Sequence, residues 1–394
     1  MTSICLYFQI HQPIRLKNYT FFQIGYDHQY DDVQLNYQIL NKVADRCYLP
    51  VNALLLEMIK KHKGKFKVAF SISGVALEQF VQYRPEVITS IRRLVDTGCV
   101  EILSETYYHS LASVYSPEEF TKQVKKHRDT IKYLFDIEPT TFRNTHWVYS
   151  DAVAQQVADM GYYDTILAEG APQLIENDDA SFVFKAGETD LNLLLRHYKL
   201  SDDIAFRFPD QSWEHYPLTP EKFAKWVHAL DGKADTINLF MDYETFGEHK
   251  GAETGILEFL RNMPEAVLAN ENFSFLTPAE TVKAYKVKKQ LDVPSEITWA
   301  DAERDLSGWN HNHMQKDALK KLYGLEPLIK ESKSREFADI FGRLQTSDHL
   351  YYMSTKYWND GVRQTFSPYK SPYDAYIIYM NVLSDFEQLV KSSL

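Results

Sequence analysis

The chain has 394 residues, of which 44% are apolar and 25% charged, and this ordinary globular balance excludes general disorder. Its 43 Lys and Arg against 54 Asp and Glu give a net charge of −11. Nucleic acid and anionic membrane surfaces would repel such a chain, so we expect neither as a partner.

Three features of the sequence predict a cytoplasmic protein. No run approaches the ~20 continuous apolar residues that a bilayer-spanning helix needs. The first residues, MTSICLYFQIHQP, lack the basic start and the small-residue cleavage site of a signal peptide. Cys5, Cys47 and Cys99 are odd in number and far apart, which favours buried free thiols over a disulfide framework or a CxxC metal site.

Seven short apolar runs, each ending abruptly in polar residues, predict strands that are buried on both faces. Helical patterns lie between several of them, and the clearest begins at the cap Ser116 and ends near Phe135. Strands that alternate with helices indicate an α/β fold with a parallel sheet, and seven of them allow a (β/α)7 barrel, whose chemistry would lie at the carboxyl ends of the strands. The runs are Ser3–Ile10, Lys67–Ile72, Val100–Leu103, Thr141–Phe142, Thr165–Leu167, Leu191–Leu195 and Ile237–Met241.

After about Pro294 the pattern changes to helices only. Helices are expected over Ala318–Ile329, His349–Tyr357 and Tyr373–Val390. We therefore predict two parts, a barrel over residues 1–294 and a helical C-terminal region over residues 295–394 that packs on the barrel.

The stretch LFMDYETFGEHK, residues 239–250, carries the sharpest chemical signal. Asp242 and Glu244 are two positions apart, so on a strand both carboxyl groups point to the same side. Their mutual repulsion would raise the pKa of one of them, which would suit a general acid. The alternative is a structural role, in which these acids cap a helix or pair with Lys250.

Histidines follow three other predicted strands. They are His11 in HQP, His109 in EILSETYYHSL and His146 in FRNTHWVYSD. Tyr107 and Trp147 lie beside them and could stack on sugar rings. A single histidine at a strand end is more often structural, but three of them together with Asp242 favour one shared site.

These stretches, taken in order, resemble the conserved regions of glycoside hydrolase family 57, the α-amylase and glucanotransferase family, and most closely its short α-amylase group. The resemblance covers nearly the whole chain. It rests on HQP (11–13), EILSETYYHSLA (101–112), FRNT (142–145), HYKLSDDIAFRF (197–208), FMDYETFGEH (240–249), WADAERDLSGWNHNHMQKDAL (299–319) and TSDHLYYMSTK (346–356).

The resemblance implies a (β/α)7 barrel and a retaining α-glucan hydrolase, with α-glucan or maltooligosaccharide as the partner and no cofactor or metal. The general acid of the family falls on Asp242, and the histidines expected to hold sugar hydroxyls fall on His11 and His109. The remaining residues expected to contact substrate are Tyr107, Trp147, Glu244, Trp299, Asp301, Asp305 and Trp309.

One position departs from the family pattern. The nucleophile of the family is a Glu directly after FRNT, and here that position is His146. A retaining mechanism needs a carboxylate there to attack the anomeric carbon and to offset the charge of the transition state. Opposite unit charges ~4 Å apart at an effective dielectric of ~20 interact by about 4 kcal/mol. Losing that interaction costs about three decades in rate, so we expect retaining hydrolysis to be very weak or absent.

Two further hypotheses stay open at this point. Glu105 or Glu169 could serve as the base of an inverting glycosidase with Asp242 as the acid, which needs a carboxylate gap of roughly 6.5–9.5 Å. Alternatively, the four residues His11, His109, His146 and Asp242 could bind Zn²⁺ in a deacetylase-like, metal-dependent enzyme. The sequence determines neither the preferred glucan and its chain length nor the oligomeric state.

Overall fold

All seven predicted runs form strands in the computed structural model, which describes residues 1–174, 180–357 and 362–394. Their side chains are almost all buried, as expected for strands with packing on both faces. The strands are β1 (Thr2–Ile10), β2 (Val68–Ile72), β3 (Val100–Ile102), β4 (Thr141–Arg143), β5 (Thr165–Glu169), β7 (Asn192–Arg196) and β8 (Thr236–Asp242).

The strands belong to two sheets. In one the order is β3-β2-β1-β8, with β9 (Phe273–Phe275) also paired to β1. In the other the order is β10-β6-β7-β5-β4, where β6 spans Val183–Ala186 and β10 spans Val287–Leu291. Within the described ranges all pairs are parallel except β6 with β7. The α/β class with parallel strands is therefore confirmed.

The two sheets are hydrogen-bonded to each other at two places. Between β3 and β4, the Ser104 N–H donates to Thr141 O at 3.0 Å and the Arg143 N–H donates to Ser104 O at 2.9 Å. Between β7 and β8, the His197 N–H donates to Asn238 O at 2.8 Å. A small apolar cluster with residues from both sheets fills the space between their facing sides. It includes Tyr7, Leu103, Trp147, Leu167, Leu194 and Phe240.

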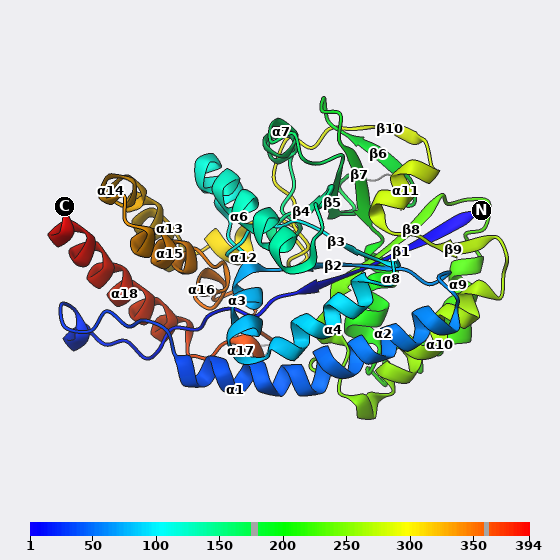
Figure 1. Ribbon diagram of the computed structural model, residues 1–394, viewed down its shortest axis with the longest axis horizontal. Coiled ribbons are helices and arrows are strands. Elements are labelled where there is room, and N and C mark those ends of the chain that lie inside the picture. The colour runs from blue at the N-terminus through cyan, green and yellow to red at the C-terminus, as the bar shows by residue number, and fades with distance from the viewer. Residues whose placement is uncertain (175–179, 358–361) are drawn as a thin grey trace.

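Helices cover the outer faces of the sheets (Figure 1). The start predicted for the longest of them is confirmed, because the Ser116 hydroxyl accepts from the Glu119 N–H and Pro117 opens α6. The helices are α1 (Val33–Val43), α2 (Leu49–Lys61), α3 (Gly74–Tyr83), α4 (Pro85–Val95), α5 (Ala112–Tyr115), α6 (Pro117–Phe135), α7 (Asp151–Asp159), α8 (Tyr198–Asp202), α9 (Pro220–His228), α10 (Ile256–Leu268) and α11 (Pro278–Ala284).

The later helices lie together on the side of the molecule where the chain ends (Figure 1). They enclose an apolar cluster of their own, which also takes Leu16, Tyr19 and Tyr30 from the segment after β1. Among the described helices, none is long and apolar enough to cross a membrane. These later helices are α12 (Ser307–Asn310), α13 (His313–Gly324), α14 (Glu326–Ser332), α15 (Arg335–Leu344), α16 (Asp348–Tyr351), α17 (Val362–Phe366) and α18 (Pro372–Ser393).

Two helix predictions in this part need correction. The helix expected over Ala318–Ile329 is two helices, because Pro327 has no N–H to donate and disfavours a continuous helix. The helix expected over His349–Tyr357 ends at Tyr351. Two carbonyls near the end of α16 accept hydrogen bonds from side chains of α13 and its N-cap. Gln315 Nε2 donates to Leu350 O, and Asn312 Nδ2 donates to Met353 O.

Candidate functional site

The three histidines predicted to share a site do lie together. The His11 ring stacks on the His109 ring, with centroids 3.9 Å apart and planes 20° apart. His109 meets His146 edge-on at 4.8 Å. They follow β1, β3 and β4, so the strand ends converge as expected for a parallel sheet. We call these three residues the histidine cluster.

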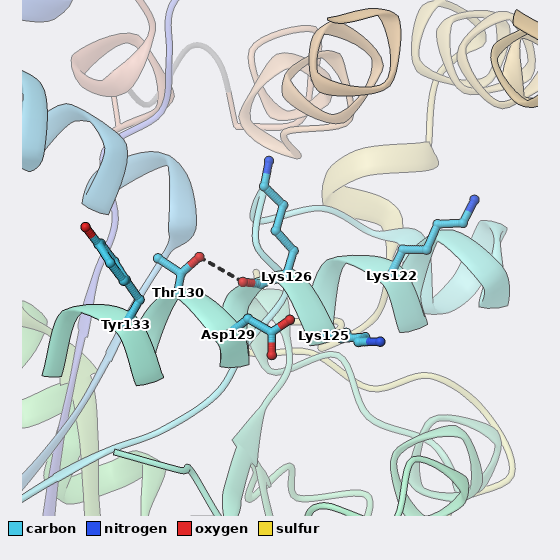
Figure 2. Close-up of a pocket in the computed structure, with 6 residues that line it drawn as sticks. All are labelled: Lys122, Lys125, Lys126, Asp129, Thr130 and Tyr133. Carbon is cyan, nitrogen blue, oxygen red and sulfur yellow. Dashed lines mark hydrogen bonds between the residues drawn. The ribbon is translucent and has the colours of Figure 1, made fainter. Parts of the chain in front are cut away.

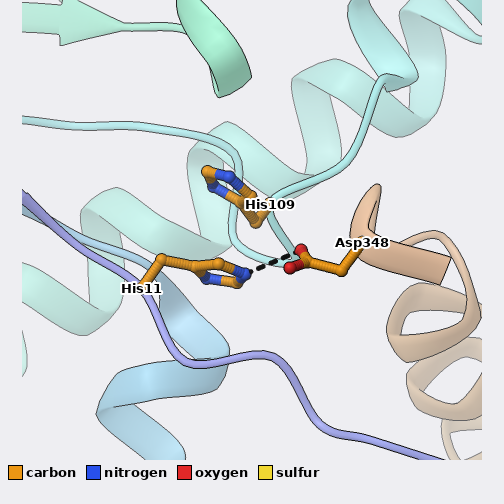
Figure 3. A group of neighbouring side chains, drawn as sticks. All are labelled: His11, His109 and Asp348. Carbon is orange, nitrogen blue, oxygen red and sulfur yellow. Dashed lines mark hydrogen bonds and ion pairs between the residues drawn. The ribbon is translucent and has the colours of Figure 1, made fainter. Parts of the chain in front are cut away.

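A carboxylate that the sequence reasoning missed completes this group. Asp348, in the first turn of α16, places Oδ2 3.0 Å from His11 Nε2 (Figure 3). Burial by itself raises the pKa of Asp348, but the facing imidazoles, His11 first, lower it well below its usual range. Asp348 is therefore ionised at neutral pH. Two signals were available, the helix start at Thr346-Ser347-Asp348 and the family-like stretch TSDHLYYMSTK, but neither predicts a charge beside His11.

Both ring nitrogens of His146 are engaged. Trp299 Nε1–H donates to His146 Nδ1 at 3.5 Å, which leaves the proton on Nε2, and Nε2 lies 2.7 Å from Ser347 Oγ. The ring also stacks on Trp309, with centroids 4.3 Å apart. The backbone is left-handed here, with φ of +52° at His146 and +59° at Trp147. Such conformations are held by surrounding contacts and concentrate at functional sites.

Burial keeps two of the imidazoles neutral. Desolvation lowers the pKa of His109 and of His146 well below the usual range, and the neighbouring charges of the cluster and of Arg143 lower it further. His109 Nδ1 also lies 3.2 Å from Glu105 Oε2 and 3.2 Å from Gln9 Nε2. These contacts fix the ring orientation of His109.

Asp242 and Glu244 lie beside the histidine cluster and form the carboxyl side of the site. Asp242 pairs in register with Gln9, whose side chain contacts His109, so Asp242 lies on the same face of the sheet. Its carboxylate makes no hydrogen bond to another described residue. Glu244 accepts from Tyr48 OH at 2.5 Å and from the His11 N–H at 3.3 Å.

The raised pKa expected for this pair falls on Glu244. Burial, followed by the charge of Asp242, raises the pKa of Glu244 to about 8. Glu244 therefore carries a proton at neutral pH. The prediction that one carboxyl of the pair would be shifted upward is confirmed.

Glu105 and Glu169, the alternative bases, are both buried against arginines. Glu105 lies 3.7 Å from Arg143, and Glu169 lies 3.4 Å from Arg196 and 3.3 Å from Arg304. Both glutamates are fully buried. These ion pairs give each glutamate a structural role, and truncating one partner would leave an uncompensated buried charge.

The remaining predicted residues lie in different surroundings. Tyr107 packs with Ile14, Val75 and Tyr108 and donates from its hydroxyl to Glu78. Trp147 packs against Phe240 and Tyr7 between the sheets. Asp301 lies 3.7 Å from Lys356, and the exposed Asp305 accepts from the Ser307 N–H. Of the expected sugar-binding residues, Trp299 and Trp309 contact the histidine cluster directly, through His146.

A group of metal-ligating atoms exists, but its members differ from the predicted set. His11, His109 and Asp348 each offer one ligand atom, and these atoms lie within 4.8 Å of one another (Figure 3). Asp242 and His146 are not in the group, and both ring nitrogens of His146 already have partners. The proposed four-residue zinc site is therefore not the arrangement that these strand ends form.

A surface hollow on α6 is a poor candidate for the site (Figure 2). All of its lining residues belong to one helix, and none belongs to the histidine cluster. Lys126 forms an ion pair with Asp339 at 2.8 Å, and Lys122 pairs with Glu118. The lining is Lys122, Lys125, Lys126, Asp129, Thr130 and Tyr133.

Comparisons with known proteins point to one family. The family model of glycosyl hydrolase family 57 matches residues 5–294. A Methanocaldococcus jannaschii protein named "Putative alpha-amylase" is 39% identical over 98% of this chain and 84% of its own length.

Two solved structures share the fold. One is a family 57 branching enzyme of Thermococcus kodakaraensis, with a TM-score of 0.70 and 12% identity over 89% of this chain and 86% of that one. The other is a 4-alpha-glucanotransferase of Thermococcus litoralis, with a TM-score of 0.68 and 15% identity over 89% of this chain. The chain spans 56% of the glucanotransferase, so that protein is considerably longer.

Proposed function

The chain belongs to glycosyl hydrolase family 57, and from this we propose that it binds α-1,4-glucan at the histidine cluster, with weak or no retaining hydrolysis. The family match over residues 5–294 and the relative named as an amylase support a glucan as the ligand. A largely buried, polar group of imidazoles with an ionised carboxylate suits sugar hydroxyls, which both donate and accept hydrogen bonds.

We also infer that the seven parallel strands close into the (β/α)7 barrel, with residues 295–394 as a helical region packed on it. The hydrogen bonds from Ser104 to β4 and from His197 to β8 support closure, because they join the two sheets at two places, β3 with β4 and β7 with β8. The family 57 structures with the same fold support it as well. Closure would bring all seven strand ends to one rim.

In this proposal Asp242 is the proton donor to the leaving oxygen. His11 and His109 hold sugar hydroxyls, and the ionised Asp348 accepts a hydrogen bond from a hydroxyl beside them. Glu244, protonated near neutral pH, is held beside them by the Tyr48 hydroxyl and the His11 N–H. The stacked ring of Trp309 fixes His146 on the floor of the site.

The observation that carries the proposal is the state of His146. Its burial lowers its pKa, and both of its nitrogens are already bonded, so it presents neither a negative charge nor a free lone pair to an anomeric carbon. A retaining enzyme needs a carboxylate at that place. The neighbours would accept one, because Trp299 Nε1–H and the Ser347 hydroxyl can both donate to a carboxylate.

The two alternative chemistries have less support. An inverting scheme would need Glu105 or Glu169 as a free base, whereas both are buried in arginine pairs. A metal-dependent enzyme would need Asp242 near the histidines' ligand atoms, and the group that could hold an ion contains Asp348 instead. Neither is favoured over the glucan-binding proposal.

The experiment combines binding with a restored nucleophile. Isothermal titration calorimetry with maltoheptaose should detect binding to the wild type, and chromatography of the products should detect little or no cleavage. His146→Glu should then raise hydrolysis by at least about a hundredfold, since the missing charge alone is estimated at about 4 kcal/mol.

His146→Gln is the matched control, because it has the shape of Glu without the charge, and it should give no gain. Circular dichroism should verify that both variants are folded. A folded His146→Glu variant that binds maltoheptaose and hydrolyses it no faster than His146→Gln would overturn the proposed role of this position.

A further inference from the structure

An aromatic pair leads from the histidine cluster to the surface. The rings of Phe206 and Trp299 are parallel to within 2°, with centroids 6.2 Å apart. Trp299 donates its indole N–H to His146, while Phe206 is 52% exposed. The two rings therefore form a ledge that begins beside the site and ends in solvent.

One arginine holds both halves of this ledge. The Arg304 guanidinium donates to Trp299 O at 3.2 Å and lies 3.7 Å from Asp202. Asp202 ends α8 and directly precedes the helical turn Asp203–Arg207, which carries Phe206. Arg304 also pairs with the fully buried Glu169 at 3.3 Å.

The anchor of the ledge is itself rigid. Arg196 donates to Glu169 at 3.4 Å and to Asp202 at 2.5 Å, so two arginines and two carboxylates form one connected network. A network of this kind holds its members in a single geometry. The two aromatic rings are thus held in one orientation before a ligand binds, which lowers the entropy cost of binding.

The exposure of Phe206 is not what core packing alone requires. Phe208, two residues later, is 7% exposed and packs against Phe259, as an ordinary core phenylalanine does. Phe206 instead keeps half of its surface in water on a stretch that is anchored by buried ion pairs. The apolar face of an aromatic ring and the C–H face of a glucose ring are complementary surfaces.

We propose that Phe206, together with Trp299, is a stacking subsite for one glucose ring of an α-glucan chain whose next rings lie at the histidine cluster. This inference rests on the proposed function and adds a specificity residue to it. Phe206 would favour chains long enough to cover both the ledge and the cluster over mono- and disaccharides.

The test is a ladder of glucose, maltose, maltotriose, maltopentaose and maltoheptaose titrated calorimetrically into the wild type, Phe206→Ala and Phe206→Tyr. Phe206→Ala should weaken binding of maltoheptaose by about three- to tenfold and change binding of the shortest sugar that binds by less than about twofold. Phe206→Tyr keeps the ring and should retain the wild-type affinity. Phe22→Ala, at an aromatic residue that is 86% exposed in another segment, is the control and should change nothing.

The outcomes separate the two proposals. If the wild type binds and Phe206→Ala has the same affinity as the wild type at every chain length, the subsite is overturned. The glucan-binding proposal then stays intact. A loss of equal size for every sugar would also overturn the subsite, because it would indicate damage to the cluster itself. Absence of binding of all five sugars by the wild type would overturn the proposed function, and the subsite with it.

Discussion

Burial shifts the pKa values on the two sides of the candidate site in opposite directions. On the imidazole side, burial lowers the pKa of His109 and His146 and so removes positive charge. On the carboxyl side, burial raises the pKa of Glu244 to about 8 and so removes negative charge. Desolvation disfavours whichever form is charged, so one physical effect leaves His109, His146 and Glu244 uncharged at neutral pH.

The fixed negative charge of the imidazole side therefore comes from elsewhere. Asp348 lies in α16, outside the strands, and the facing imidazoles keep its pKa well below its usual range. Its partner is His11, which follows β1, whereas His146 follows β4. The comparison teaches that an anion is present in this site but stands beside His11 rather than at position 146.

The largest expected effect concerns the carboxyl side once a nucleophile is restored. In the His146→Glu background, Asp242→Asn should lower the rate of hydrolysis by about a hundredfold or more, because a positioned general acid contributes about 10²–10⁴-fold. Initial rates of maltoheptaose cleavage measure this. Asp129→Asn, on the exposed face of α6, is the matched control and should keep the gain. Undiminished hydrolysis after Asp242→Asn would assign the proton donor to another residue.

The next effect tests the anion on the imidazole side. Asp348→Asn should lower the free energy of unfolding at pH 7 by roughly 2–4 kcal/mol, because it removes one partner of a largely buried ion pair. The pKa of Asp348 is lower in the folded state than in the unfolded chain. Its contribution is therefore complete above the unfolded pKa of about 3.9 and is lost as the pH falls toward the folded value.

Urea unfolding of the wild type and Asp348→Asn between pH 3 and pH 7 measures that contribution. The difference should be constant above about pH 5 and shrink in acid. A double-mutant cycle with His11→Gln should give a coupling energy of at least about 1 kcal/mol. Additive single and double variants would contradict a direct pair between His11 and Asp348.

The smallest effect concerns Glu244. Its pKa is higher in the folded state, so protonation favours folding, and wild-type stability should fall as the pH rises from the unfolded value of about 4.3 toward 8. Glu244→Gln imitates the protonated group and should remove this slope, giving a relative gain of roughly 1–3 kcal/mol at pH 8. Thermal unfolding at a series of pH values measures it. Glu271→Gln, at an exposed residue, should run parallel to the wild type, and a parallel curve for Glu244→Gln would exclude a raised pKa.

Local sequence signals were sufficient to predict an element where one short stretch of chain contains all the residues that determine it. The seven strand runs are apolar because both of their faces are buried, and α6 begins at Ser116 because its cap and Pro117 are adjacent in the chain. The outer strand β10 was not predictable in this way. β10 has four exposed residues in VKKQL, and only its last residue, Leu291, packs in an apolar cluster, so it shows no apolar run.

The sequence by itself determined the parallel α/β class and the convergence of His11, His109 and His146, because strand periodicity and parallel strand order fix these relations. The same-side orientation predicted for Asp242 and Glu244 assumed one strand for both, whereas β8 ends at Asp242 and Glu244 lies in the 3-10 turn Tyr243–Thr245. Only the tertiary structure decided which charges meet. Asp348 reaches His11 across 337 positions of sequence, Arg304 joins the ledge to Glu169, and burial sets which carboxyl keeps its proton. Electrostatic energies depend on the distance between groups and on their desolvation, and neither quantity can be predicted from the local pattern of residues.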